Sequence, residues 1–182
     1  VCSEFVRPDY ALHIGDYVFA GRDEQWLPAV QKQMDQFPGL GMTVHQVLAN
    51  ESRAAVYFTQ HGASGGAGGP VTCWSGVAIY RGDGERLSGC VAQEDYMTRQ
   101  RQLKSGRPDT IAAPAPAPWD VQFVPADPDA ELAVRAWLQG AWPCEHPDVL
   151  CDDEHITGAT PLAFDVQECE FSELYSVGSE VV

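Results

Sequence analysis

The sequence predicts an α+β domain in which helical segments precede a meandering antiparallel sheet. Three observations carry this prediction: a helical pattern over residues 22–37, four strand-like runs at hairpin spacing after it, and a proline-rich segment that ends the pattern. The chain has 182 residues, of which 45% are hydrophobic, so it can build one core plus part of a second domain.

The first elements are helical or extended. Residues 1–17 predict the end of a helix, a break at Arg7-Pro8 and a short extended segment. A helix over residues 22–37 follows, and Pro38-Gly39 ends it. Its apolar residues recur at spacings of three and four: Trp26, Leu27, Val30, Met34 and Phe37.

The next segment reads as a series of hairpins. Strands are predicted over residues 42–48, 53–61, 71–81 and 85–96 because these runs are rich in β-forming residues. A turn over residues 49–52 and a Gly82-Asp83-Gly84 turn separate three of them. Residues 62–70 hold five glycines in nine positions, which predicts a flexible hairpin tip or lid.

The last third of the chain differs in composition. Residues 108–126 predict a proline-rich linker or strap, with four prolines in the eleven residues 108–118. Residues 127–182 predict a helix over 127–138, capped by Asp127 or Asp129, a strand over 162–175, a turn over 176–179 and a short final strand.

This order echoes residues 1–61, so residues 127–182 are interpreted as a partial second copy of the first domain. The chain is then either a fragment of a tandem-repeat protein, or it completes itself by pairing with another chain or with its own first domain. An unfinished strand of this kind favours pairing.

The charge is unevenly distributed. Residues 1–110 hold 10 basic and 12 acidic residues, whereas residues 111–182 hold 1 basic and 14 acidic residues. Neither part offers the basic face that nucleic acid or an anionic membrane requires. No apolar run approaches the length of a membrane span and no secretory signal is visible, so a cytoplasmic location is expected. The six cysteines form no C-x-x-C pair, and mostly buried, reduced thiols are expected.

A family resemblance emerges over about residues 5–105. The central hairpin reads HQVLANESRAAVYFTQHGAS, the next hairpin reads WSGVAIYRGDGERLSG, and the final strand region reads CVAQEDYMTRQRQL with its Gln102-Leu103 pair. In order and spacing these resemble the SnoaL-like polyketide cyclases of the nuclear transport factor 2-like superfamily. The resemblance implies residues 1–107 as one such domain: a curled antiparallel sheet forming a cone-like half-barrel, closed by helices around an apolar pocket.

The resemblance implies Asp95 as the catalytic acid or base and His13 as its hydrogen-bonding partner near the pocket mouth. A carboxylate at a strand end that faces an apolar cavity is desolvated, which raises its pKa toward neutrality. The alternatives are a helix-capping Asp95 and a structural His13. Strand alternation groups Gln93 with Asp95 and places Glu94 on the other face, so a register slip makes Glu94 the inward acid.

The remaining chemistry-bearing residues support binding more than reaction. Often the family has a His-Trp pair before the acid, but Val91 and Cys90 stand there, so part of the cyclase equipment is absent. The predicted substrate-binding residues are Tyr10, Trp26, Tyr57, Trp74 and Gln93, with core packing as the alternative for the aromatic residues.

No cofactor or metal is expected. Residues 62–70 lack the Gly-Lys-Ser/Thr ending of a phosphate-binding loop, and the acidic run over residues 151–155 has the spacing of neither a zinc finger nor an EF-hand.

Two hypotheses follow. The first is an enzyme that cyclises, isomerises or hydrolyses a small apolar, cyclic or polyketide-like molecule by cofactor-free acid–base chemistry. The second is a non-catalytic ligand-binding or assembly module, because one fold hosts many functions. A homo-oligomer is expected in either case.

Overall fold

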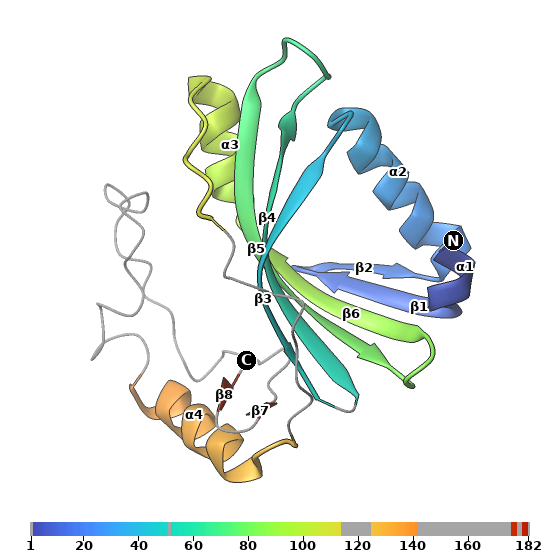
Figure 1. Cartoon of the computed structure of the whole chain (residues 1–182), viewed down its shortest axis with the longest axis vertical. Helices are drawn as coiled ribbons and strands as arrows, with labels where there is room; N and C mark the ends of the chain where they lie inside the picture. Colours follow the sequence, from blue (N-terminus) through green and yellow to red (C-terminus); the bar gives the residue numbers. More distant parts are fainter. Residues whose placement is uncertain (1, 51, 114–124, 142–175, 178–179, 182) are drawn as a thin grey trace. The chain divides into compact units, whose positions relative to one another are not determined.

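A computed structural model describes residues 2–50, 52–113, 125–141, 176–177 and 180–181 (Figure 1). The chain divides into two compact units, Val1–Val124 and Pro125–Val182, and each is described here on its own.

The first unit is built on one six-stranded sheet. Its strands lie in the order β2-β1-β6-β5-β4-β3. Their bounds are β1 Val6–Ile14, β2 Tyr17–Ala20, β3 Gly41–Ala49, β4 Arg53–Ala63, β5 Val71–Gly82 and β6 Leu87–Glu94. The sheet is strongly curved but does not close into a barrel, and α2 (Leu27–Gln36) lies across its concave side (Figure 1). The predicted α+β fold is confirmed.

One pairing differs from a simple meander. β1 pairs with β6 in parallel, whereas all other neighbours in this sheet are antiparallel. β1 itself forms a hairpin with β2, a strand that the sequence pattern did not predict. The parallel pairing joins residues about eighty positions apart in the chain, and no local pattern signals such a contact.

The helix predicted over residues 22–37 is confirmed with a modified start. Residues Arg22–Trp26 form a π-helical turn (η1), in which the Trp26 backbone N–H donates to the Gly21 carbonyl at 3.0 Å. α2 follows directly, with Pro28 in its first turn. Proline fits there because the first helical N–H groups have no partner within the helix. A short helix α1, Cys2–Phe5, precedes β1.

The predicted last strand, residues 85–96, ends earlier than expected. β6 stops at Glu94, and Tyr96–Ser105 form helix α3. Asp95 is the N-cap, because its Oδ1 accepts a hydrogen bond from the Thr98 backbone N–H at 2.8 Å. Gly106 ends the helix in the left-handed conformation that glycine tolerates.

α3 is fastened to β5 by Gln102, a fully buried side chain. Its Oε1 accepts from the Cys73 backbone N–H at 2.9 Å, and its Nε2 donates to the Cys73 carbonyl at 2.6 Å. The same Oε1 also accepts from the Asp109 backbone N–H at 3.1 Å. Gln102 therefore satisfies backbone groups of β5 as a neighbouring strand would, which gives the Gln102-Leu103 pair a structural role.

The core lies on the concave face of the sheet. It consists of buried residues of β1, β4, β5 and β6: Val6, Tyr10, Ile14, Phe58, Ala78, Cys90 and Ala92. Cys73 and Cys90 are buried free thiols and Cys2 is exposed. The other three cysteines lie outside the described residues.

The second unit has one described helix, α4 (Pro128–Ala141), and a two-stranded hairpin of β7 (Ser176–Val177) and β8 (Glu180–Val181). Asp127 Oδ1 caps α4 by accepting from the backbone N–H groups of Asp129 and Ala130 at 3.0 and 3.2 Å. Residues 176–177, predicted as part of a turn, are a strand instead. The predicted strand over 162–175 lies outside the described residues, and the partial second copy stays a prediction.

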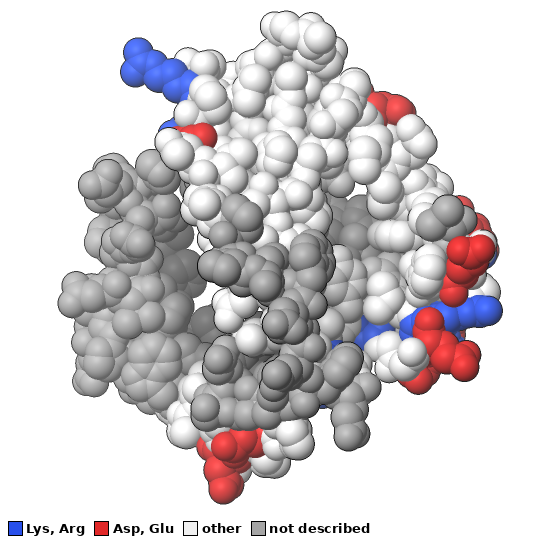
Figure 2. Space-filling model, viewed as in Figure 1, with Lys and Arg blue, Asp and Glu red and all other residues white. Residues whose placement is uncertain are grey.

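Charged side chains form no basic patch in the face that Figure 2 shows, over the part of the chain described. Arg7 and Arg22 each pair with a neighbouring acid, Asp9 and Asp23. None of the described helices combines the length and apolar character needed to cross a bilayer. Within the same residues, no group of three His, Cys, Asp or Glu side chains is arranged to hold a metal ion, and the acidic run 151–155 lies outside them.

Candidate functional site

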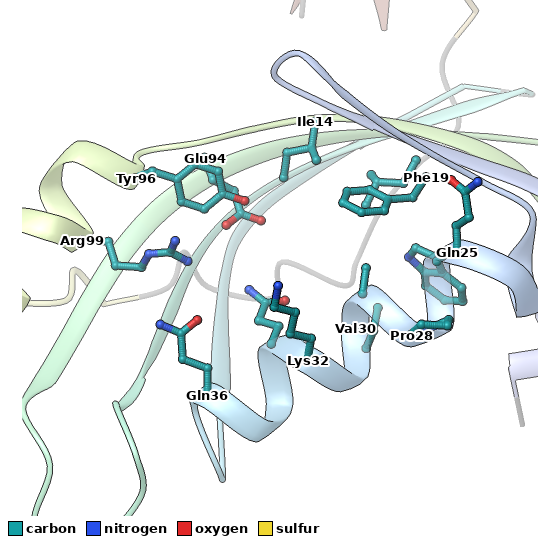
Figure 3. A pocket seen from close by; sticks show the side chains of 14 residues that line it. Ile14, Phe19, Gln25, Pro28, Val30, Lys32, Gln36, Glu94, Tyr96 and Arg99 are labelled. Carbon is teal, nitrogen blue, oxygen red and sulfur yellow. The ribbon is translucent and has the colours of Figure 1, made fainter.

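A cavity of about 590 Å³ opens between α2 and the concave face of the sheet (Figure 3). Its size suits a small organic molecule. The fourteen lining residues come from β1, β2, η1, α2, β6 and α3: Leu12, Ile14, Phe19, Gln25, Trp26, Pro28, Ala29, Val30, Lys32, Gln33, Gln36, Glu94, Tyr96 and Arg99.

One end of the cavity is mainly apolar, with Gln25 beside Phe19 as its polar side chain (Figure 3). Leu12 and Ile14 project from β1, Phe19 projects from β2, and Trp26 and Val30 face them from η1 and α2. The Trp26 ring packs against the buried Tyr10 ring, with centroids 4.9 Å apart. This end can bury the rings or chain of an apolar ligand.

The other end is polar. Glu94 ends β6, and Tyr96 and Arg99 lie in the first turn of α3, so three polar lining side chains come from six consecutive residues. Figure 3 shows the Glu94 carboxylate and the Arg99 guanidinium pointing into the space above α2. Lys32 and Gln36 of α2 line the same space.

Glu94 is held by the indole of Trp74. The Trp74 Nε1–H donates to Glu94 Oε2 at 2.7 Å, and the Trp74 side chain is only 1% exposed. Trp74 in turn packs against Phe37, with ring centroids 5.3 Å apart. The carboxylate therefore has a fixed position on a rigid support.

Burial raises the pKa of Glu94 above its ordinary value. The hydrogen bond from Trp74, the nearby positive charge of Arg99 and a hydrogen-bonding interaction with Tyr96 act in the opposite direction, but burial dominates. A carboxyl group with a raised pKa can exist in both protonation states closer to neutral pH, which general acid–base catalysis requires.

Tyr96 complements Glu94 as a hydrogen-bond donor. Burial, followed by the negative charge of Glu94, raises the pKa of Tyr96 to about 12. The phenol therefore keeps its proton at neutral pH and can donate it to an oxygen atom of a ligand or of Glu94.

The predicted catalytic residues lie elsewhere. Asp95 caps α3 and is not among the residues that line the cavity. His13 is exposed, and since its neighbours Leu12 and Ile14 both line the cavity, strand alternation directs His13 to the opposite face. The structure does not bring Asp95 and His13 together at the cavity.

The five predicted binding residues separate into three groups. Trp26 lines the cavity, while Tyr10 and Trp74 are buried behind it, Trp74 as the donor to Glu94. Tyr57 is 44% exposed and packs against the His45 ring instead. Gln93 is exposed, beside Glu94 in the sequence but on the other face of β6.

The sequence pattern predicted Glu94 as the inward-facing acid only as the alternative to Asp95. The predicted alternation, with Gln93 on one face and Glu94 on the other, holds in the structure. The face assignment could not be made because it depends on where β6 ends. The second available signal was the helix-capping alternative for Asp95, because aspartate is a preferred N-cap residue.

Comparison with known proteins identifies the fold. No family model and no curated protein matches the sequence. Among solved structures, a proposed polyketide cyclase from Acidithiobacillus ferrooxidans superposes with a TM-score of 0.52 at 18% identity, covering 58% of this chain and 82% of that one. A proposed SnoaL-like polyketide cyclase from Jannaschia sp. CCS1 superposes with a TM-score of 0.50 at 14% identity, covering 56% and 74%. The chain thus shares the curved α+β fold of these two structures.

Proposed function

We propose that the cavity binds a small, largely apolar cyclic molecule bearing a carbonyl group, and that Glu94 moves a proton on it. The observation that carries this proposal is the Glu94 carboxylate, which Trp74 holds at 2.7 Å at the polar end of a cavity whose other end is apolar. A desolvated acid beside an apolar binding surface is the arrangement that proton transfer requires.

The simplest reaction is enolisation. Ionised Glu94 takes a proton from the carbon next to the carbonyl, the C–H bond breaks, and its electron pair moves to the carbonyl oxygen as an enolate. The Tyr96 hydroxyl stabilises that oxygen by hydrogen bonding. Glu94 then returns the proton to carbon. The same enolate can attack a second carbonyl, so isomerisation and aldol-type cyclisation share this first step.

Hydrogen–deuterium exchange tests the proposal directly. A panel of cyclic ketones in D₂O is followed by proton NMR, because exchange at the carbon next to the carbonyl requires only proton removal and return. We expect the protein to accelerate exchange of at least one member, and Glu94→Gln to lower that rate by at least about a hundredfold. Glu4→Gln is the matched control, since Glu4 is exposed and outside the cavity.

Non-catalytic binding is the second candidate. Glu94 Oε2 already accepts the Trp74 N–H, so the carboxylate also serves to fix the cavity wall. Ligand-observed NMR on the same panel separates the two functions. Binding without exchange in the wild type identifies a binding module, whereas neither binding nor exchange by any member contradicts the proposal.

A homo-oligomer stays a prediction. Tyr57 and Val77 are direct neighbours on β4 and β5, and they expose 44% and 38% of their surface. Light scattering coupled to size-exclusion chromatography measures the mass, and a lower mass for Tyr57→Ser would support association through this face.

A further inference from the structure

Arg99 is held in the cavity wall by aromatic rings. Its guanidinium carbon lies 4.3 Å from the centre of the Tyr96 ring, 5.0 Å from that of Trp74 and 5.9 Å from that of Phe37. Phe37 and Trp74 are fully buried, so two of the three rings cannot move away. Cation–π attraction of this kind orients an arginine without using its hydrogen-bond donors.

Those donors form no salt bridge with the surrounding described residues, although the charge of Arg99 acts on the nearby Glu94 carboxylate. Among residues 2–50 and 52–113, salt bridges join aspartates to Arg7, Arg22 and Arg101, and none of these involves the Arg99 guanidinium. Figure 3 shows the guanidinium pointing into the cavity between Glu94 and Gln36. Its N–H groups are therefore placed to meet a ligand.

The charge of the cavity lining also indicates an anionic ligand. Two cationic side chains, Lys32 and Arg99, and one acid, Glu94, line the cavity. The lining carries a net positive charge whether Glu94 is ionised or protonated. In a chain with a net charge of −15, this is a local exception. A positive cavity wall favours an anionic group on the ligand.

We infer that Arg99 binds a carboxylate of the ligand, with Lys32 as a second positive charge across the cavity, so that the ligands of this site are cyclic carboxylic acids. This inference rests on the proposed function of the cavity and narrows it. A carboxylate accepts two parallel N–H bonds from a guanidinium, a geometry that a neutral amide or ester cannot reproduce at equal strength. With the carboxylate at the polar end, the rings of the ligand extend toward Phe19 and Trp26.

The test compares two ligands that differ only in charge. Binding of an indanone carboxylic acid and of its primary carboxamide is measured by isothermal titration calorimetry at neutral pH. For the wild type we expect the acid to bind at least about tenfold more tightly than the amide, equivalent to about 1.4 kcal/mol. Added salt should weaken binding of the acid and leave the amide unchanged.

Variants assign the preference to Arg99. Arg99→Gln should bring the acid and the amide to equal affinity, and Arg99→Lys should keep part of the preference, because it retains the charge but loses the planar pair of donors. Arg107→Gln, an exposed arginine outside the cavity, makes the same change in net charge and should leave the preference intact. If Arg99→Gln fails to fold, the comparison of acid and amide in the wild type, with its salt dependence, still tests the inference.

Each outcome decides one of the two proposals. Equal affinities in the wild type, or a preference that survives in folded Arg99→Gln, overturns the role of Arg99. If only uncharged ketones bind, the role of Arg99 is also overturned, but the proposed function of the cavity is retained. If neither the charged nor the uncharged ketones bind, the proposed function fails and this inference fails with it.

Discussion

The two ends of the cavity are assembled from different parts of the chain. The apolar end comes from one continuous stretch, β1 through α2, in which Leu12, Phe19, Trp26 and Val30 are close in sequence. The polar end joins β6 and α3 to α2, with Trp74 of β5 behind them. Hydrophobic burial is non-directional, so a local stretch can supply it, whereas hydrogen-bonded acids need partners at fixed positions.

This contrast predicts different sensitivities at the two ends. At the polar end, a substitution that removes one hydrogen-bond partner should change stability or catalysis sharply. Changes at the apolar end should alter ligand affinity gradually, in proportion to the area lost.

The largest effect is expected from Gln102→Leu, which detaches α3 and with it the polar end. Leucine leaves the Cys73 N–H and C=O buried without their partner. We expect the free energy of unfolding to fall by about 3 kcal/mol and Tm by roughly 10 °C. Calorimetry checks this, with Gln100→Leu, an exposed glutamine of the same helix, as control. A change below about 0.5 kcal/mol would show that Gln102 does not anchor α3.

At the apolar end, Phe19→Ala should weaken binding of both the acid and the amide by about tenfold, because it removes about 1.5 kcal/mol of apolar contact. The preference for the acid should stay unchanged. Val18→Ala is the matched control, since Val18 is the adjacent β2 residue, 52% exposed and outside the cavity lining. Loss of the acid preference in Phe19→Ala would contradict the separation of the two ends.

Glu94→Gln should stabilise the fold at neutral pH. Burial raises the pKa of Glu94 in the folded protein above its ordinary value of 4.5. The folded protein is therefore most stable while Glu94 is protonated, below about pH 4.5. This stability is lost as the pH rises through the pKa that Glu94 has in the folded protein. The neutral amide carries no such penalty and still offers an oxygen to Trp74, so we expect a gain of about 1 kcal/mol at pH 7.

The gain from Glu94→Gln should disappear as the pH is lowered toward 4. Thermal unfolding at several pH values measures it. A gain that stays constant with pH would mean that the ionised carboxylate is not the source of the instability.

The smallest effect is expected from Asp95→Asn, the residue next to Glu94. Asparagine caps helices about as well as aspartate, so the free energy of unfolding should change by less than about 0.5 kcal/mol. The exchange rate of ketone protons should also stay close to that of the wild type. A hundredfold loss of exchange would return the catalytic role to Asp95, as the family resemblance implied.

The elements that sequence patterns predicted best are those with strong local periodicity. The helix over residues 22–37 and the hairpin strands β3, β4 and β5 lie within a few residues of their predicted bounds. The failures are local signals overridden by distant contacts. The predicted strand ran to residue 96 and residues 97–105 were assigned no element, apart from the alternative that Asp95 caps a helix. They form α3, which Asp95 caps and Gln102 fastens to Cys73.

The sequence alone determined the fold class, the helix over residues 22–37 with its apolar face, and the alternation that separates Gln93 from Glu94. These depend on residue type and spacing along a single strand or helix. Only the tertiary structure decided which face of β6 meets the cavity, that Trp74 donates to Glu94, and that three rings hold Arg99. The Trp74–Glu94 hydrogen bond depends on the register of β5 with β6, and the position of Arg99 depends on the packing of α3 against β5. The cavity also depends on the parallel pairing of β1 with β6, a contact between distant residues that no local spacing encodes.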